Sequence, residues 1–179
     1  MNHKGSCLES DHQALRVVAE YIREGAIVAV KGIGGFHLIV DARNQDSVKK
    51  LRIRKNREEK PFALMYHSLR VVKEHCEVSK AEENLLHSAE SPIVLLKRKP
   101  SDIAYDVAPE NPYIGVMLPY TPLHHILMSE ISFPVVATSG NISDEPITTD
   151  EHEAIGKLNG IADFYLIHNR PIAHHVDDS

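Results

Sequence analysis

The chain has 179 residues, of which 42% are hydrophobic and 25% charged, and its formal net charge is -5. This size suits one globular domain, and the acidic balance argues against a general nucleic-acid binder. No apolar run approaches the roughly 20 residues that cross a bilayer, and neither a signal-peptide core nor a CxxC pair is present. We therefore expect one cytoplasmic domain over residues 1–179, without membrane contact, disulfide scaffold or structural zinc.

Helix and strand signals alternate along the chain. Ser10 or Asp11 caps an amphipathic helix that stops at Gly25, and Ser79 with Glu82 has the spacing of a capping box. Interleaved strands and helices predict an α/β fold around a mixed sheet. Helices are expected over 10–24, 46–56, 79–89, 121–130 and 149–160, and strands over 26–30, 36–40, 62–66, 92–98, 134–139 and 164–168. The strands at 92–98 and 134–139 read as buried, and residues 99–113, with three prolines, read as a long functional or mobile loop.

The segment "KGIGGFH", residues 31–37, joins the first two predicted strands. It is not a Walker A loop, because Lys31 precedes the glycines, and the spacing of Gly32, Gly34 and Gly35 does not fit a dinucleotide fingerprint. One interpretation is a tight hairpin that uses glycine for positive φ angles. The other is a backbone that a ligand approaches closely.

A basic cluster, "KKLRIRKNREEK" at residues 49–60, contains seven basic and two acidic residues. Lys55, Arg57 and Lys60 lie near the end of the predicted helix, where a turn could bring them together on one polyanion. A solvated helix face is the alternative.

A polar turn, "ATSGNISDEP" at residues 137–146, follows a predicted buried strand. Ser139, Asn141 and Ser143 supply short donors and acceptors at a strand end, where α/β proteins commonly bind ligands. The histidine pairs do not predict a metal site, since adjacent helical residues point about 100° apart. No G-x-S-x-G elbow supports a hydrolase.

The order of these motifs along the chain resembles that of a known protein family. "VKGIGGFHLIVDA", "LRIRKNREEKPFALM", "SPIVLL", "IGVMLPYTPLHHIL", "VVATSGNISDEPI" and "HNRPIAHHVDDS" together resemble the YrdC-like domain of HypF, the carbamoyltransferases of NiFe-hydrogenase maturation. The chain is similar, more distantly, to the YrdC family of threonylcarbamoyl-AMP synthases. The resemblance implies a twisted mixed sheet flanked by helices, with a basic concave surface that binds ATP together with Mg²⁺.

The resemblance also implies site residues. Lys55 and Arg57 match the family's catalytic and phosphate-contacting basic residues, and no resident metal ligands are implied. The expected ATP and phosphate contacts are Lys55, Arg57, Lys60, Ser139, Asn141, Ser179 and Arg170, and the expected carbamate pocket is lined by Lys31, Gly34, Gly35 and His37.

The implied reaction joins carbamate, derived from carbamoyl phosphate, to ATP and gives carbamoyl adenylate and pyrophosphate. Implied partners are the remaining HypF regions, none of which is present here, and the acceptor protein HypE. One alternative is a threonylcarbamoyl-AMP synthase serving tRNA modification, against which the HypF-like "GGFHL" counts. Another is a module that binds double-stranded RNA, which the net charge of -5 makes the weakest reading.

Overall fold

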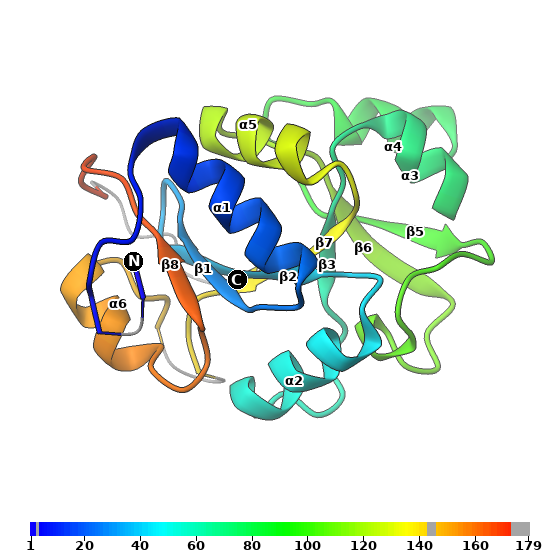
Figure 1. Cartoon of the computed structure of the whole chain (residues 1–179). Helices are drawn as coiled ribbons and strands as arrows, with labels where there is room; N and C mark the ends of the chain where they lie inside the picture. The colour runs from blue at the N-terminus through cyan, green and yellow to red at the C-terminus, as the bar shows by residue number, and fades with distance from the viewer. Residues whose placement is uncertain (3, 143–145, 173–179) are drawn as a thin grey trace.

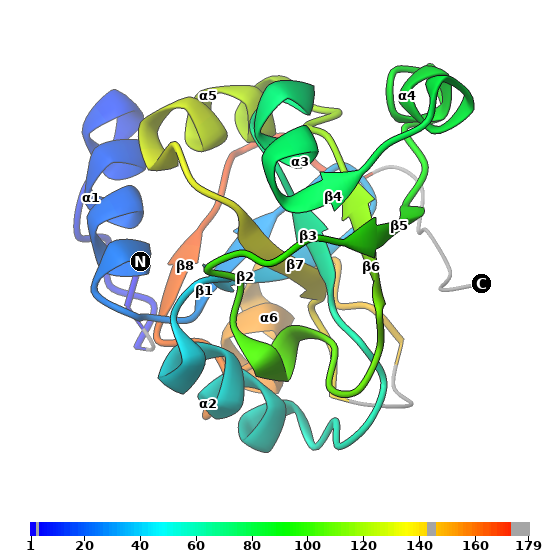
Figure 2. The ribbon, with the colours of Figure 1, turned by 90° about the vertical axis from the view of Figure 1, so that its right-hand side faces the viewer.

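The computed structural model describes residues 1–2, 4–142 and 146–172. In this part of the chain, eight strands form one twisted sheet in the order β4-β5-β6-β3-β7-β2-β1-β8, with helices on both faces (Figures 1 and 2). The predicted α/β fold with a mixed sheet is confirmed, because β1 pairs with β8 and β3 with β6 in parallel while the other pairs are antiparallel. The strands are β1 (Val28–Lys31), β2 (Phe36–Asp41), β3 (Ala63–Met65), β4 (Cys76–Glu77), β5 (Val94–Arg98), β6 (Tyr113–Met117), β7 (Val135–Ser139) and β8 (Phe164–Leu166).

Side chains cap four of the six described helices, but Ser10, at the predicted start of the first helix, makes no capping hydrogen bond. Ser79 and Glu82 form the expected capping box, and the side chains of Thr121 and Asp150 accept backbone N–H groups of the first turns that follow them. Each such cap stabilises a helix by about 1 kcal/mol. The helices are α1 (Asp11–Arg23), α2 (Gln45–Lys55), α3 (Leu69–His75), α4 (Lys80–Leu86), α5 (Pro122–Ile131) and α6 (Glu151–Lys157), with a 3₁₀ turn η1 (Tyr105–Val107).

Two apolar layers sandwich the sheet. On one face, α1 and α5 lie side by side and pack Ile22 and Ile131 against Val30 and Ile39 of the strands (Figure 1). On the other face, α2, α3, α4 and α6 pack against the alternate side chains, as Leu51 of α2 does. The end of the sheet that carries β4 and β5 lies beside α3 and α4 (Figure 2).

The segment 99–113 is not a free loop. Four of its residues are buried in the core, namely Ile103, Ala104, Val107 and Ala108. The Phe62 amide donates to the Val107 carbonyl at 2.9 Å. The sequence did not predict this packing because the apolar residues have neither helical nor strand periodicity, and a short 3₁₀ turn together with contacts to distant residues holds them.

The strand at 94–98 also differs from the prediction. Val94 and Leu96 are buried, but Leu95 between them is 68% exposed, so β5 has one buried face and not two. The strand lies near the edge of the sheet, next to the two-residue β4, and Leu95 on its second face is not covered by any of the described helices. The sequence analysis did not predict α3, β4 and β6.

Candidate nucleotide site

The basic cluster of residues 49–60 is divided between the core and the surface. Arg52 and Lys55 are only 8% and 1% exposed, and they continue the buried face of α2 begun by Val48 and Leu51. Positions i, i+3, i+4 and i+7 share one helix face, so the spacing of these four residues was a signal that the sequence analysis missed. Two more basic side chains of α2 are also paired, as both donate to the Asp163 carboxylate.

Lys55 lies beneath the polar turn that follows β7. Its ammonium donates to the Ser139 carbonyl at 2.8 Å and to the carbonyl and side-chain oxygens of Asn141, each at 2.6 Å. The Ser139 hydroxyl donates in turn to Asn141 Oδ1 at 2.6 Å. The structure thus brings together three residues that the sequence placed in one site, but Lys55 is a buried support for the turn and not a surface cation.

Arg52 shapes the turn that carries the exposed cations. Its guanidinium donates to the carbonyl oxygens of Arg57, Glu58 and Lys60 at 3.0, 3.1 and 3.3 Å. Burial lowers the pKa of this guanidinium from its ordinary value, and the nearby Asp106 opposes that shift. Arg52 is therefore a buried anchor of the turn.

Arg57 and Lys60 are presented at the surface of this turn. Arg57 is half-buried, donates to the carbonyl oxygens of Lys60 and Pro61 at 3.0 and 2.8 Å, and stacks 5.1 Å above the Phe62 ring centroid. Lys60 is exposed. Arg57 and Lys60 are thus presented at the surface, whereas Arg52 holds the backbone of their turn and Lys55 holds the turn at Ser139 and Asn141.

The glycine loop is a hairpin, as one interpretation held, but its glycines serve a different purpose. β1 and β2 pair antiparallel, and the Gly32 amide donates to the Gly35 carbonyl at 2.8 Å. A Cβ on Gly35 would lie 2.3 Å from Ile147 Cγ2, and one on Gly32 would lie 3.0 Å from the His37 ring. These two glycines therefore permit close packing, while their φ angles are outside the left-handed region.

Lys31 is neither solvated nor an open cation. It is 1% exposed, its ammonium lies 2.8 Å from Glu151 Oε2, and it also donates to the His168 carbonyl at 3.2 Å. The hydrogen bond from Lys31 lowers the pKa of the Glu151 carboxyl from its ordinary value. Lys31 therefore joins the end of β1 to the first turn of α6 and to the segment after β8.

His37 lies opposite Ser139 in the β2–β7 pairing, and cross-strand neighbours of this kind have adjacent side chains. Its Nε2 lies 3.0 Å from the Tyr120 hydroxyl, and its ring meets His124 edge to face with centroids 5.8 Å apart. His37 was a predicted site residue, whereas its neighbours Tyr120 and His124 were not. The segment "PYTPLHH" contained them, without any spacing that pointed to β2.

The remaining predicted residues are less defined. Gly34 is half-buried in the hairpin turn, and Arg170 is exposed in the segment after β8. Ser143 and Ser179 lie outside the described residues.

Among the residues that the structure describes, no three His, Cys, Asp or Glu side chains gather as a metal site would require. Within the same residues, no helix has the length and hydropathy that crossing a bilayer needs.

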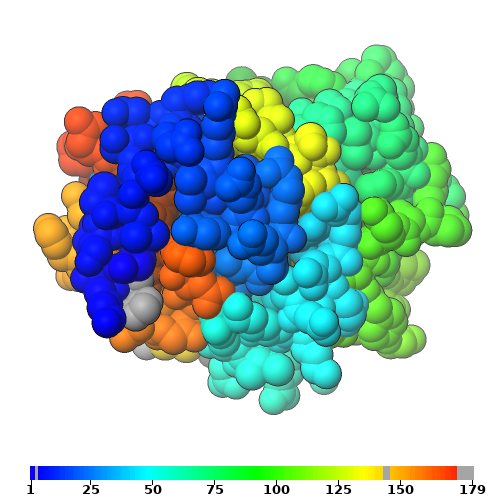
Figure 3. All heavy atoms as spheres, viewed as in Figure 1, coloured from blue at the N-terminus to red at the C-terminus, as the bar shows by residue number. Residues whose placement is uncertain are grey.

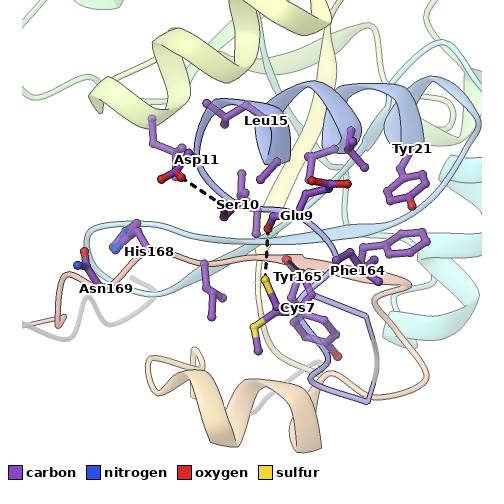
Figure 4. Close-up of a pocket in the computed structure, with 18 residues that line it drawn as sticks. Cys7, Glu9, Ser10, Asp11, Leu15, Tyr21, Phe164, Tyr165, His168 and Asn169 are labelled. Carbon is purple, nitrogen blue, oxygen red and sulfur yellow. Dashed lines mark hydrogen bonds between the residues drawn. The ribbon is translucent and has the colours of Figure 1, made fainter.

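A cavity of about 470 Å³ lies elsewhere, between the N-terminal segment, α1 and β8. Figure 3 shows the N-terminal residues lying against the β8 end of the molecule, and Figure 4 shows Cys7, Glu9 and Asp11 beside this cavity. Its described lining is largely apolar, includes two carboxylates and contains no lysine or arginine. A phosphate-bearing ligand therefore fits the Arg57 and Lys60 turn better than this cavity.

Helix α2 thus links two turns, since its Lys55 holds the polar turn at Ser139 and Asn141 and its Arg52 holds the turn that carries Arg57 and Lys60. Cations of this kind stabilise negative charge on phosphate oxygens. The basic cluster is less suited to binding double-stranded RNA, because four of its seven basic side chains are buried or paired with Asp163.

Comparison with known proteins finds one matching family and several relatives. The family described as "Telomere recombination", which groups Sua5, YciO and YrdC, matches residues 20–179. The chain is 46% identical over 179 residues to carbamoyltransferase HypF of Synechocystis sp., covering 99% of this chain and 23% of that protein. It is 25% identical over 142 residues to threonylcarbamoyl-AMP synthase of Bos taurus, covering 79% of this chain and 51% of that protein. The chain thus spans about a quarter of the HypF relatives.

Solved structures give the same picture. A full-length HypF in a phosphate- and nucleotide-bound form superposes with a TM-score of 0.89 at 51% identity, covering 92% of this chain and 26% of that one. Sua5 of P. abyssi in complex with L-threonine superposes with a TM-score of 0.79 at 20% identity, covering 91% of this chain and 49% of that one. The second likeness shows the shared fold.

Proposed function

Since this chain belongs to the Sua5, YciO and YrdC family, we propose that it binds ATP and forms carbamoyl adenylate as the YrdC-like part of a HypF-type carbamoyltransferase. The observation that carries the proposal is the clamp of Lys55 on the Ser139 and Asn141 turn, at distances of 2.6 to 2.8 Å. The same helix, α2, anchors the turn of the cations Arg57 and Lys60 through Arg52. The likeness to a nucleotide-bound HypF supports ATP as the ligand.

In the proposed reaction, a carboxylate oxygen of carbamate attacks the α-phosphorus of ATP. The new bond is O–Pα, the bond that breaks joins Pα to the bridging oxygen of the β-phosphate, and pyrophosphate leaves with the electron pair. No proton has to move, because carbamate reacts as an anion. Catalysis of this kind depends on positioning and on neutralising charge on the departing oxygens.

The side chains divide into contacting and supporting groups. Arg57 offers a planar fork and Lys60 a point charge to the phosphates. Ser139 and Asn141 hold the nucleotide near the end of β7, with Lys55 supporting them from below. Gly34, Gly35 and His37 form one wall of the carbamate pocket, and Lys31 stiffens that wall through its ion pair with Glu151.

Magnesium enters only with the nucleotide. The described residues offer no cage of carboxylates around the proposed phosphate position, and Mg²⁺ commonly retains water and binds phosphate oxygens directly. The residues present therefore fit a metal carried by ATP. When bound, the ion would neutralise charge on the phosphates.

The remaining partners follow from the relatives. The carbamoyl group would pass to other HypF regions and from there to the acceptor protein HypE. Carbamoyl phosphate would supply carbamate through a region that this chain does not include. Residues Arg170 and Ser179 remain proposed contacts of the nucleotide.

Calorimetric titration with ATP and Mg²⁺ tests the nucleotide site. Arg57→Ala should weaken ATP binding at least tenfold, about 1.4 kcal/mol, because one charge-assisted contact is lost. Its stability should change by less than about 1 kcal/mol, since the hydrogen bonds of Arg57 to backbone carbonyls and its stacking on Phe62 lie near the surface. Arg70→Ala, which removes an exposed arginine paired with Glu74 on α3, is the matched control and should leave ATP affinity unchanged.

Equal ATP affinity in the wild type and Arg57→Ala would remove that residue from the site, and no ATP binding by the wild type would contradict the proposal. The threonylcarbamoyl-AMP synthase relatives motivate a second arm. Pyrophosphate release that requires both bicarbonate and threonine would favour that activity over carbamoyl adenylation.

A further inference from the structure

One aromatic ring, that of Phe62, lies against two guanidinium groups at the turn that carries the exposed cations. The guanidinium carbon of Arg57 lies 5.1 Å from the Phe62 ring centroid, and that of Arg52 lies 4.7 Å from it. Both distances are within the range of about 6 Å over which a cation and a ring attract each other. Phe62 is 1% exposed and Arg52 is buried, whereas Arg57 is half-buried. The ring thus joins an arginine at the surface to an arginine of the core.

Phe62 itself is fixed from within the fold. Its amide donates to the Val107 carbonyl at 2.9 Å, and its ring belongs to the same apolar layer as Leu51 of α2. The residue before it is Pro61, whose own ring restricts the backbone at this point. Side chains in a close-packed core occupy defined rotamers, so Phe62 presents a fixed surface to the guanidinium of Arg57.

Arg52 fixes the backbone that carries Arg57. Its guanidinium donates to three carbonyl oxygens of the turn, and also to those of Asp106 and Val107 in η1 at 2.6 and 3.3 Å. Serving carbonyl oxygens of two separate segments requires the planar fork and five donors of an arginine, because a lysine ammonium has three donors at a single point. Arg52 therefore ties the turn to the segment 99–113.

We propose that Phe62 and Arg52 are positioning residues, which orient the Arg57 guanidinium for a phosphate group before the nucleotide binds. This inference rests on the proposed function, in which Arg57 contacts the phosphates of ATP. Ordering a free arginine side chain costs rotamer entropy. Here the ring of Phe62 and the two carbonyl oxygens that accept from Arg57 order this side chain when the chain folds. The nucleotide then binds to a guanidinium that is already in place, which raises affinity.

A purely structural role for Phe62 leads to a different expectation. If the ring only filled the core, its replacement would lower the free energy of unfolding and leave the ATP affinity of the folded chain unchanged. If the ring acts through Arg57, its effect on ATP affinity requires the Arg57 side chain. A double-mutant cycle separates these two cases, because it measures how far the effect of one change depends on the other residue.

Calorimetric titration of the whole chain with ATP and Mg²⁺ measures the cycle. Phe62→Leu should weaken ATP binding roughly two- to fivefold, which is the factor that corresponds to one cation–π contact at an exposed site. In the Arg57→Ala background, the same change should have no further effect. Equal weakening in both backgrounds, or unchanged affinity in the Phe62→Leu single variant, would overturn the proposal. Val72→Ala is the control for lost stability, because Val72 is buried in α3, which lies apart from α2 in both Figures 1 and 2; its ATP affinity should equal that of the wild type.

Arg52→Lys tests the second positioning residue, since it keeps the charge and removes the fork. It should weaken ATP binding in the wild-type background, and by a smaller factor in the Arg57→Ala background. Part of the effect remains there because Arg52 also holds the Lys60 carbonyl. An ATP affinity of Arg52→Lys equal to that of the wild type would overturn the role of Arg52.

The Arg57 Nε–H signal in ¹H–¹⁵N spectra supplies a readout that needs no nucleotide. Its loss in Arg57→Ala identifies it, and the hydrogen bond from Nε to the Lys60 carbonyl should slow its exchange with water. Phe62→Leu should move this signal towards that of a free arginine, and Val72→Ala should not; Phe62→Met, which fills similar space, replaces Phe62→Leu if the latter fails to fold. An unmoved signal would overturn the proposal. If the wild type binds no ATP, the proposed function fails, and this signal still decides whether Phe62 positions Arg57.

Discussion

The neutral, buried His124 makes a quantitative prediction about stability and pH. In the folded chain its pKa is about 3, against an ordinary value of 6.5. Between these values the unfolded chain takes up a proton that the folded chain does not, so the unfolded state binds more protons. Stability therefore falls as the pH falls below 6.5, and it is lost progressively down to about pH 3.

The size of this effect between pH 7 and pH 5 follows from the two pKa values. At about pH 5 the unfolded imidazole is almost fully protonated and the folded one is not, which costs about 2 kcal/mol relative to pH 7. Any folded pKa well below 5 gives nearly the same result, because the folded ring is then neutral over the whole interval. For a chain of this size the cost corresponds to a decrease in Tm of roughly 4–8 °C.

Urea unfolding at pH 7 and pH 5 measures this difference. His124→Phe keeps a ring of similar shape without a titrating group, so it should lack about 2 kcal/mol of the acid destabilisation shown by the wild type. It should also be at least as stable as the wild type at pH 7, since it removes two unpaired polar atoms. His125→Phe, at the exposed neighbouring position on α5, is the control and should retain the wild-type pH dependence.

Equal pH dependence in the wild type and His124→Phe would refute this reasoning. It would mean that the ring has a partner or meets water in solution. All other ionisable groups are present in both chains, so the comparison isolates position 124.

Two further predictions concern packing and ion pairing. Gly35→Ala should destabilise the chain by about 1–3 kcal/mol, because its Cβ would lie 2.3 Å from Ile147 Cγ2; Gly156→Ala, where nothing lies within 4 Å, should be neutral or slightly stabilising. Unfolding midpoints of the two variants decide this, and equal midpoints would contradict the close approach. Asp163→Asn should cost about 1–2 kcal/mol, as its carboxylate accepts from two basic side chains of α2 at 2.8 and 2.7 Å and from a backbone amide at 2.9 Å. Burial by itself would raise the pKa of this carboxyl, but the hydrogen bonds outweigh burial and lower the pKa. The greater stability of the wild type over Asp163→Asn should therefore disappear in acid, where the carboxylate is protonated. A stability difference that persists in acid would count against the ion pairs.

Local signals in the sequence were sufficient for most of the elements. The capping box at Ser79, the cap at Thr121 and the stop at Gly25 depend on side chains and backbone angles within a few residues. Such features survive in any tertiary context, because neighbours along the chain make them. The same local information failed for the segment 99–113, whose buried residues are held by partners distant in sequence.

For the candidate site, too, one part could be predicted from the sequence and another part was decided only by the tertiary structure. The sequence by itself determined that Lys55, Ser139 and Asn141 belong together, through the order of motifs shared with a family, and it offered the hairpin at residues 31–37 as one of two interpretations. Only the tertiary structure decided that Lys55 is buried under the turn and that Lys31 is paired with Glu151. A sequence shows which residues are charged but not which of them are buried. A lysine on the inner face of a helix cannot be told from one on the outer face until its partners are known.

The aromatic cluster depended on tertiary structure entirely. Nothing in the spacing of His37, Tyr120 and His124 indicates contact, because the sheet order places β2 and the connection before α5 together only after the chain has folded. The sequence determined which rings are available. The packing of α5 against the sheet decided that one of them is covered from water with both nitrogens unused, and that burial is the physical reason why the ring stays neutral.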